Sequence, residues 1–416
     1  MAGTKIASLD PGPAKPPPTV SGPLFVPVMH GIRGLAVLTV ILYHTAGAAL
    51  WTPSHDVPRG LYEAAGPFAV DVLFFTTGFV LFLPVVLKGS LGSLGGFAIR
   101  RFARIGPPYY VCLLLVVVLF PLLSDPRLVS VSDRGLGALL IHIGFLQREL
   151  SPTNPGFIVN SPVWSLSVDI AFYLVFPLIA SKYLRHPLIG LAVAITATVA
   201  WRTAFIEPHG VATSQAEMLR FLIQPPLFLA DFAGGMTAAW AFLRLRERGW
   251  ARIHPRRMVA TALGALGGLL VLAYLMGSNL PYHLGVFQEP AAVRVLVPLV
   301  LLVFVVAAAL TPAWAQRPLT NRPLSWFSEI SYSVYLYHYP IIFFGLFTLG
   351  IRQDGSLPWS WAALVLPSAI AIGALSYFLI ELPSRDFGRR VARRYVRGER
   401  SGPASPAAES VLDNRV

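Results

Sequence analysis

Two ionisable side chains in the first apolar segment could carry out acid–base chemistry. Arg33 and His44 are eleven residues apart in HGIRGLAVLTVILYH. In an α-helix this spacing makes three turns plus about 20°, with about 16 Å of rise, so both side chains share one face. Ionisable groups inside a membrane are costly and usually functional, which favours a functional role for His44. The structural alternative is that Arg33 snorkels and His44 bonds a backbone carbonyl.

Two carboxylates are candidates to orient His44. Asp71 lies in the first two turns of the second apolar segment, and Asp169 about two turns below the outer end of the fourth. Depth counting puts both near the level of His44 and predicts a shared polar cavity. A carboxylate beside an imidazole fixes its tautomer and raises its basicity, as a base acting on a hydroxyl requires. The alternative, above all for Asp71, is a structural ion pair between helices.

An arginine cluster precedes the third apolar segment. Arg100, Arg101 and Arg104 lie within one helical turn, near the depth expected for Arg33. Guanidinium forks match phosphate oxygens, and coenzyme A presents three phosphates in the cytosol, so the four arginines could clamp such a ligand. Basic residues at this place are also expected from topology alone.

The ninth apolar segment carries a polar stripe within SEISYSVYLYHYPI. Ser331, Tyr335 and His338 stand at i, i+4 and i+7, on one helix face. Such a stripe could line a channel, with Tyr335 and His338 contacting substrate, or could hydrogen-bond neighbouring helices together.

The sixth apolar segment combines charges with a helix breaker. Arg220 lies near its outer end, followed by Pro225, Pro226 and Asp231. A broken helix with charged residues suggests a cavity in the membrane, and suits a transporter equally well.

The composition identifies the elements that must position these residues as membrane helices. The 416 residues are 55% hydrophobic and 13% charged, whereas a soluble domain is about a quarter charged. Mean hydropathy is +0.63. We therefore expect an all-α, polytopic integral membrane protein of about ten transmembrane helices. The expected spans are roughly 26–50, 67–87, 105–123, 162–180, 187–206, 219–243, 258–276, 293–311, 325–349 and 359–380.

Loop charge predicts the orientation. Lys88–Arg104 holds four basic residues, Arg244–Arg257 six, and the stretch from Glu381 to Arg400 seven, whereas the intervening loops carry mixed charge. The positive-inside rule places the basic loops in the cytoplasm. The chain is expected to be a multi-pass protein of the cell membrane with both termini cytoplasmic.

Three regions follow from the same pattern. We expect a disordered cytoplasmic arm at 1–22, a transmembrane domain at 23–384 and a cytoplasmic tail at 385–416 that is basic and then disordered. Gly135–Gln147 is apolar but only about half a spanning length, so it is interpreted as re-entrant or interfacial. A true span there would put the Arg244–Arg257 loop outside, against its charge.

Two classes of function are disfavoured. The net charge of +13 does not indicate nucleic acid, because the basic residues fall in short clusters between apolar segments. Cys112 is the single cysteine, so neither an intrachain disulfide nor a cysteine-based metal site is possible, and no metal site is expected.

Six segments, in this order, resemble the membrane-bound acyltransferase-3 family, whose members modify cell-surface sugars and some antibiotics. The first segment is similar to the family's opening helix, with its arginine, ten residues and a histidine. Asp169 stands where a glutamate is usual, which keeps the charge with a shorter reach; likewise His30 replaces an aspartate and Thr77 a serine. The segments are HGIRGLAVLTVILYH, DVLFFTTGFVL, RRFARIGPPYY, SPVWSLSVDIAFYLVFP, ISYSVYLYHYPI and ELPSRDFGRRV.

The resemblance implies that His44 is the catalytic histidine and Arg33 its essential companion. It implies an O-acyltransferase with acyl-CoA, acetyl-CoA above all, as donor substrate and no permanently bound cofactor. The acceptor would be a hydroxyl of a cell-surface glycan, glycolipid or secreted glycoside. A pantetheine arm could reach from the arginine cluster toward His44, which would deprotonate the acceptor or accept the acyl group itself.

Two other classes remain open at this point. A polytopic transporter could use His44, Asp169 and Asp231 as a proton relay, although transporters usually show paired halves and none is evident. The second alternative is a noncatalytic membrane scaffold, which would have no need of charged residues at matched depth.

Overall fold

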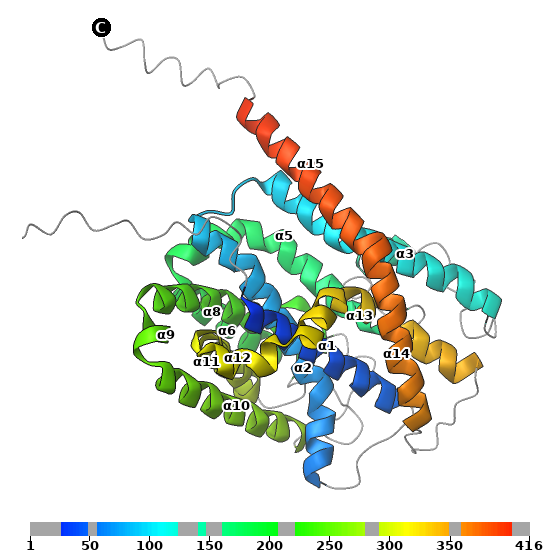
Figure 1. The fold of residues 1–416 in the computed structure, drawn as a ribbon, viewed down its shortest axis with the longest axis horizontal. Coiled ribbons are helices and arrows are strands. Elements are labelled where there is room, and N and C mark those ends of the chain that lie inside the picture. Colours follow the sequence, from blue (N-terminus) through cyan, green and yellow to red (C-terminus); the bar gives the residue numbers. More distant parts are fainter. Residues whose placement is uncertain are drawn as a thin grey trace, which may run out of the picture.

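The computed structural model describes residues 26–48, 56–123, 140–146, 160–206, 221–278, 291–348 and 359–401, and every regular element in these ranges is helical (Figure 1). The all-α expectation is therefore confirmed. The main helices are α1 (Pro27–Ala48), α2 (Asp56–Lys88), α3 (Leu94–Leu123), α5 (Trp164–Arg185), α6 (Pro187–Trp201), α8 (Leu229–Glu247), α9 (Trp250–Ile253), α10 (Pro255–Ser278), α11 (Ala291–Leu310), α12 (Ala313–Thr320), α13 (Arg322–Thr348), α14 (Trp359–Ser376) and α15 (Leu382–Ser401).

Short irregular helices join or extend several of these. Two 3₁₀ turns, η2 (Ser161–Val163) and η5 (Pro225–Phe228), lead into α5 and α8, and two π turns, η3 (Arg202–Ile206) and η6 (Tyr377–Glu381), follow α6 and α14. The proline pair of η5 accounts for the expected break, since proline lacks the N–H that a helix interior needs.

The predicted spans coincide with these helices. Within the described ranges, eight helices are long and apolar enough to cross a bilayer, and there are nine if α11 and α12, which are bent by 118° to each other, form one span. α13 matches the remaining predicted span with 27 residues, but its serines, tyrosines and histidine lower its hydropathy. The structure is thus a polytopic membrane protein, as the composition predicts.

The segment interpreted as re-entrant is described only over 140–146. Its helical turn ends at Gly144 and Phe145, where Phe145 has a φ of 57°. Tyr109 and Tyr110 of α3 donate hydrogen bonds to the backbone carbonyls of His142 and Ile143, at 2.9 Å each. The described part is therefore a short turn held against α3, and the rest of 135–147 lies outside the described residues, as do the 1–22 arm and the tail beyond 401.

Aromatic contacts show that α2 and α8 run parallel. Phe74 packs on Phe228, immediately before α8, with ring centroids 4.6 Å apart, and Phe79 packs on Phe242 at 6.2 Å. Residue numbers that rise together on both helices mean a shared direction. α1 runs antiparallel to α2, because Tyr43, near the end of α1, packs on Tyr62 at 5.4 Å.

Glycine permits the close crossing of α2 and α8. A Cβ at Gly78 would collide with the carbonyl of Phe232, and one at Gly235 with the carbonyl of Phe75. Small residues at helix crossings let backbones approach within a membrane, where packing replaces the hydrophobic effect between helices.

The C-terminal ends of α2 and α8 define what we call the basic end of the bundle. Their last turns carry Lys88, Arg244 and Arg246. The start of α1 lies at the same end, where Gly31 contacts the backbone of Leu319 in α12. Basic segments far apart in the sequence therefore gather on one side of the molecule (Figure 1).

The basic part of the predicted tail is helical. α15 continues α14 through η6 and packs along the first half of α3 (Figure 1). Gly388 faces Ala103, and Gly95 faces Tyr395, so the two helices are antiparallel.

We predict that the basic end faces the cytoplasm. Single-cysteine reporters at Arg252 and Asp354, in a background lacking Cys112, should react differently with a membrane-impermeant maleimide. In intact cells the Asp354→Cys protein should be labelled and the Arg252→Cys protein should not, because the Arg244–Arg257 loop carries six basic residues. Both should react after permeabilisation. Labelling of Arg252→Cys in intact cells would invert the orientation.

Candidate active site

His44 pairs with a second histidine from another helix. Its Nδ1 lies 2.9 Å from Nε2 of His338 on α13, and the two rings are 5.2 Å apart between centroids and nearly parallel. α1 and α13 pack closely because Gly34 contacts the backbone and side chain of Leu324. His338 is fully buried, whereas His44 is half-buried.

The remainder of the polar stripe on α13 anchors this pair. Nδ1 of His338 lies 2.6 Å from the backbone carbonyl oxygen of Tyr335. The Tyr335 hydroxyl donates to the carbonyl of Pro162 at 2.7 Å and lies 2.9 Å from Oγ of Ser165. Tyr335 thus ties α13 to the start of α5. Ser331 turns back to the carbonyl of Ser328 at 2.8 Å.

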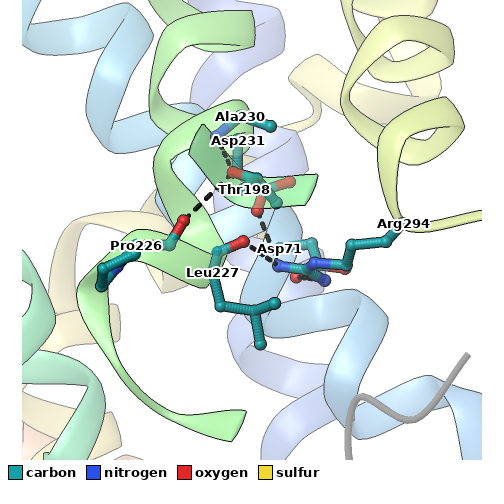
Figure 2. Close-up of polar contacts among 7 residues, drawn as sticks. All are labelled: Asp71, Thr198, Pro226, Leu227, Ala230, Asp231 and Arg294. Carbon is teal, nitrogen blue, oxygen red and sulfur yellow. Dashed lines mark hydrogen bonds and ion pairs between the residues drawn. The ribbon is translucent and has the colours of Figure 1, made fainter. Parts of the chain in front are cut away.

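No carboxylate is a hydrogen-bond partner of His44 in the described part of the chain. Asp71 lies instead in a buried ion-pair cluster (Figure 2). Arg294 of α11 contacts Asp71 through one guanidinium nitrogen at 2.5 Å and Asp231 of α8 through the other at 2.8 Å. All three residues are at most 1% exposed. The expected contact between Asp71 and His44 is therefore wrong.

The error in the placement of Asp71 has a physical cause. The predicted span began at residue 67, but α2 begins at Asp56, about three turns earlier. Asp71 therefore lies deeper in the bundle than His44, which is in the last turn but one of α1. We assign Asp71, with Arg294 and Asp231, to the joining of α2, α8 and α11.

Neighbouring polar and aromatic groups hold the cluster in place (Figure 2). The Arg294 guanidinium lies over the ring of Phe228, 4.9 Å from its centroid, and is 3.5 Å from the carbonyl of Leu227. Thr198 of α6 bridges the break before α8, because its hydroxyl donates to the carbonyl of Pro226 and accepts from the N–H of Ala230, both at 3.1 Å. Backbone groups freed by the proline pair are satisfied in this way.

Asp169 groups with Arg33 rather than with His44. Both line a cavity of about 60 Å³ whose other walls come from α1, α2, α5 and α13. The Thr77 side chain hydrogen-bonds the Asp169 carboxylate, and Arg33 is the cation that acts most strongly on it. The expectation that Asp169 shares the depth of His44 is therefore not met, since Arg33 and His44 are three turns apart on α1.

The cavity leads from Arg33 toward the histidine pair. Its apolar walls include Val37, Phe74 and Leu166, and its polar groups at the far end are Ser165 and Tyr335. Tyr335 lines the cavity with its side chain, and its backbone carbonyl is bonded to His338. It therefore connects the cavity to the histidine pair. Arg33 and His44 both face α13.

Three of the four predicted arginines gather at the basic end of the cavity. Arg101 and Arg104 act electrostatically on Arg33 and on Asp169. Arg101 also lies between the rings of Phe97 and Tyr173, 5.7 and 5.9 Å from their centroids. Arg100 is exposed on α3 and acts electrostatically on Arg101. Positive charge is in excess here, which suits an anionic ligand.

Two buried ionisable residues were missed from the sequence. Arg294 is a lone arginine within the apolar run AAVRVLVPLV, a pattern that could have identified it as functional or paired. Glu381, in the closing segment, accepts a hydrogen bond from Ser333 at 2.9 Å and lies 3.6 Å from Arg385. It also acts on Arg33, which extends the charged cluster to the start of α15.

The structure argues against the transporter relay. Such a relay needs His44, Asp169 and Asp231 along one path. Asp231 is paired with Arg294, Asp169 groups with Arg33, and the partner of His44 is His338.

The chain is similar to proteins described as acyltransferases. The family model described as an acyltransferase domain matches residues 27–378. Peptidoglycan O-acetyltransferase OatA of Listeria monocytogenes is 27% identical over 88% of this chain and 56% of its own. Acyltransferase MdmB of Streptomyces mycarofaciens is 29% identical over 88% of this chain and 93% of its own.

A third relative is the putative peptidoglycan O-acetyltransferase YrhL of Bacillus subtilis, 24% identical over 89% of this chain and 57% of its own. The chain therefore spans just over half the length of OatA and YrhL. No solved structure matches the chain. Because the acyltransferase model covers the bundle from α1 to the end of α14, the chain belongs to the acyltransferase-3 family of membrane acyltransferases.

Proposed function

We propose that the protein transfers an acyl group, acetyl in the first instance, from a coenzyme A thioester to a hydroxyl of a cell-surface glycan, glycolipid or secreted glycoside. One observation supports the proposal above all: a cavity runs from Arg33, in the arginine cluster, to Tyr335, whose backbone carbonyl is bonded to His338 of the histidine pair. An acyl-CoA that reacts with a hydroxyl needs cations around its phosphates and a base beside its thioester.

The donor would be held at Arg33, Arg101 and Arg104. Their charge exceeds that of Asp169 and Glu381, so the phosphates of coenzyme A would complete the cluster. The pantetheine arm would enter the cavity and carry the thioester toward Tyr335 and the pair.

His44 would act as the general base. It removes the proton from the acceptor hydroxyl, the oxygen attacks the thioester carbonyl, the carbon–sulfur bond breaks, and His44 returns the proton to the leaving thiolate. The direct alternative is attack by His44 itself to give an acyl-histidine. The acceptor would approach from the side opposite the basic end. α1 starts at the basic end, and His44 lies near its other, C-terminal end.

The relatives support a glycan acceptor. OatA and YrhL carry peptidoglycan O-acetylation in their names, and this chain matches just over half of the length of each. Mass spectrometry of surface glycans from a strain lacking the gene tests this directly. Loss of an O-acyl group is expected, and an unchanged set of glycans and glycolipids would contradict the proposed acceptor class.

We predict that losing Arg33, Arg101 or Arg104 weakens donor binding. A phosphate lost from an arginine fork costs about 1.5 to 3 kcal/mol, a tenfold to hundredfold rise in the dissociation constant. Each arginine should be replaced by glutamine and titrated with coenzyme A by calorimetry. The difference from the parent should shrink as salt rises, because exposed phosphates are screened.

Arg393, exposed on α15, offers a matched control for this series. The Arg393→Gln protein should bind coenzyme A like the parent, and Arg100→Gln should show a smaller effect than substitution of the three half-buried arginines. If the Arg33, Arg101 and Arg104 variants all bind coenzyme A with the affinity of the parent, the cluster serves topology alone and the donor is held elsewhere.

A further inference from the structure

We propose that His338 is a positioning residue that holds His44 in the tautomer with its proton on Nδ1, leaving Nε2 as the basic nitrogen. The proposed function supplies the reaction in which this tautomer is used, whereas the tautomer itself follows from hydrogen bonds among α1, α13 and the backbone. His338 thereby takes the place expected for a carboxylate beside His44.

His338 carries its proton on Nδ1. Its Nδ1 lies 2.6 Å from the backbone carbonyl oxygen of Tyr335. A carbonyl oxygen can only accept a hydrogen bond, so Nδ1 of His338 must carry a proton. A neutral imidazole has one N–H, and therefore Nε2 of His338 presents a lone pair.

The lone pair on Nε2 of His338 fixes the position of the proton on His44. Nδ1 of His44 lies 2.9 Å from that lone pair. Two bare nitrogens at this distance would repel, so Nδ1 of His44 must donate. The proton of neutral His44 is therefore on Nδ1, and its Nε2 is unprotonated. Both rings have the same tautomer, set by one backbone carbonyl.

Packing keeps this chain of hydrogen bonds in register. Tyr335 cannot swing, because its hydroxyl is bonded to Pro162 and lies beside Ser165. His338 is fully buried, so water cannot replace His44 as its partner. The ring of Tyr339 lies edge-on to His44 at 5.5 Å, which limits rotation of the imidazole.

Only one nitrogen of the pair remains for chemistry. Both nitrogens of His338 and Nδ1 of His44 are engaged, whereas Nε2 of His44 has no hydrogen-bond partner among the described residues. Nε2 lies on the opposite edge of the ring from Nδ1, and the His44 side chain is only half-buried. It can therefore meet an acceptor hydroxyl.

Protonation strengthens the arrangement at the moment of reaction. When Nε2 of His44 takes the acceptor's proton, the ring becomes an imidazolium and its Nδ1–H bond to His338 becomes charge-assisted. A neutral imidazole accepts this bond without placing a second charge in the membrane, whereas an unpaired buried carboxylate is costly before the proton arrives.

Nitrogen-15 NMR of histidine-labelled protein in lipid nanodiscs reads the tautomer without any assay of activity. The chain has nine histidines, so the His44 signals are assigned by their loss in His44→Gln. In the parent we expect Nδ1 of His44 protonated and Nε2 bare. In His338→Phe, which keeps a ring but no acceptor, the Nδ1–H preference of His44 should disappear. A proton on Nε2 of His44 in the parent would overturn the proposal.

Kinetics with two matched substitutions separate positioning from packing. The amide oxygen of His338→Gln can still accept from His44, whereas His338→Phe keeps ring volume but removes the acceptor. We expect the phenylalanine protein to lose about a hundredfold in kcat with little change in KM, and the glutamine protein to recover a large part of the loss. Equal losses, or better activity with phenylalanine, would show that His338 acts through packing alone.

The two failures are distinguishable. If His44 shows the Nδ1–H tautomer but no acyl transfer is found with any hydroxyl acceptor, the proposed function fails and the tautomer assignment stands. If transfer proceeds while Nε2 of His44 carries the proton, the function stands and the assignment fails.

Discussion

Replacing His44 with alanine is expected to lower kcat for acyl transfer by about a thousandfold, within the range found for general-base catalysis. The protein should still insert, because one half-buried side chain near the end of α1 is removed from a bundle of long apolar helices. Affinity for coenzyme A should change little, since the arginine cluster is about three turns away along α1. Release of free thiol from acetyl-CoA in the presence of acceptor measures the loss.

A second variant, His44→Gln, distinguishes loss of catalysis from a folding defect. Alanine leaves Nε2 of His338 buried without a donor, whereas the amide nitrogen of His44→Gln can still donate to it. Both variants should be inactive, and the glutamine protein should elute and unfold like the parent. His186, exposed at the end of α5, gives a matched histidine-to-alanine control that should retain full activity. Parent-like turnover by well-folded His44→Gln protein would remove His44 from the mechanism.

Replacing Arg294 with methionine is expected to destabilise the bundle by about 3 to 5 kcal/mol, the usual consequence of removing one partner from a buried ion pair. Two buried carboxylates, Asp71 and Asp231, would lose the guanidinium that joins them (Figure 2). Unfolding of purified protein by denaturing detergent, followed by tryptophan fluorescence, measures the difference.

Two further variants show whether the loss of stability in Arg294→Met comes from the isolated buried charges. Combining Arg294→Met with Asp71→Asn and Asp231→Asn should restore most of the stability, because no isolated buried charge remains. Arg389→Met on α15 breaks an exposed pair with Asp386, at 3.3 Å, and should change the stability by less than about 1 kcal/mol. If Arg294→Met unfolds like the parent but cannot transfer acyl groups, the cluster belongs to the catalytic machinery rather than to helix packing.

The sequence predicts the helices well because each span is a local property. Apolar runs of spanning length fix where a helix must lie in a membrane, and the ten expected spans coincide with helices in the structure. Arg33 and His44 share a face because both lie on one helix, where the 3.6-residue period decides direction. Neither inference needs knowledge of any other helix.

Contacts between helices were predicted poorly for an equally physical reason. They depend on the rotation of each helix about its axis and on the residue at which each helix begins. Neither can be predicted from the depth of a residue in its span. Depth counting placed Asp71 beside His44, yet α2 starts at Asp56 and Asp71 meets Arg294. The partner of His44 is His338, a residue expected to contact substrate.

Acyl transfer by purified protein in nanodiscs is the most direct test of the proposed function. The protein is supplied with radiolabelled acetyl-CoA and a soluble peptidoglycan fragment with free hydroxyls, and the label on the glycan is counted. We predict ester-linked label that depends on time and on the glycan and is lost in His44→Gln. If the parent labels neither this fragment nor extracted envelope glycans and glycolipids, or if His44→Gln labels them as fast as the parent, the account is contradicted.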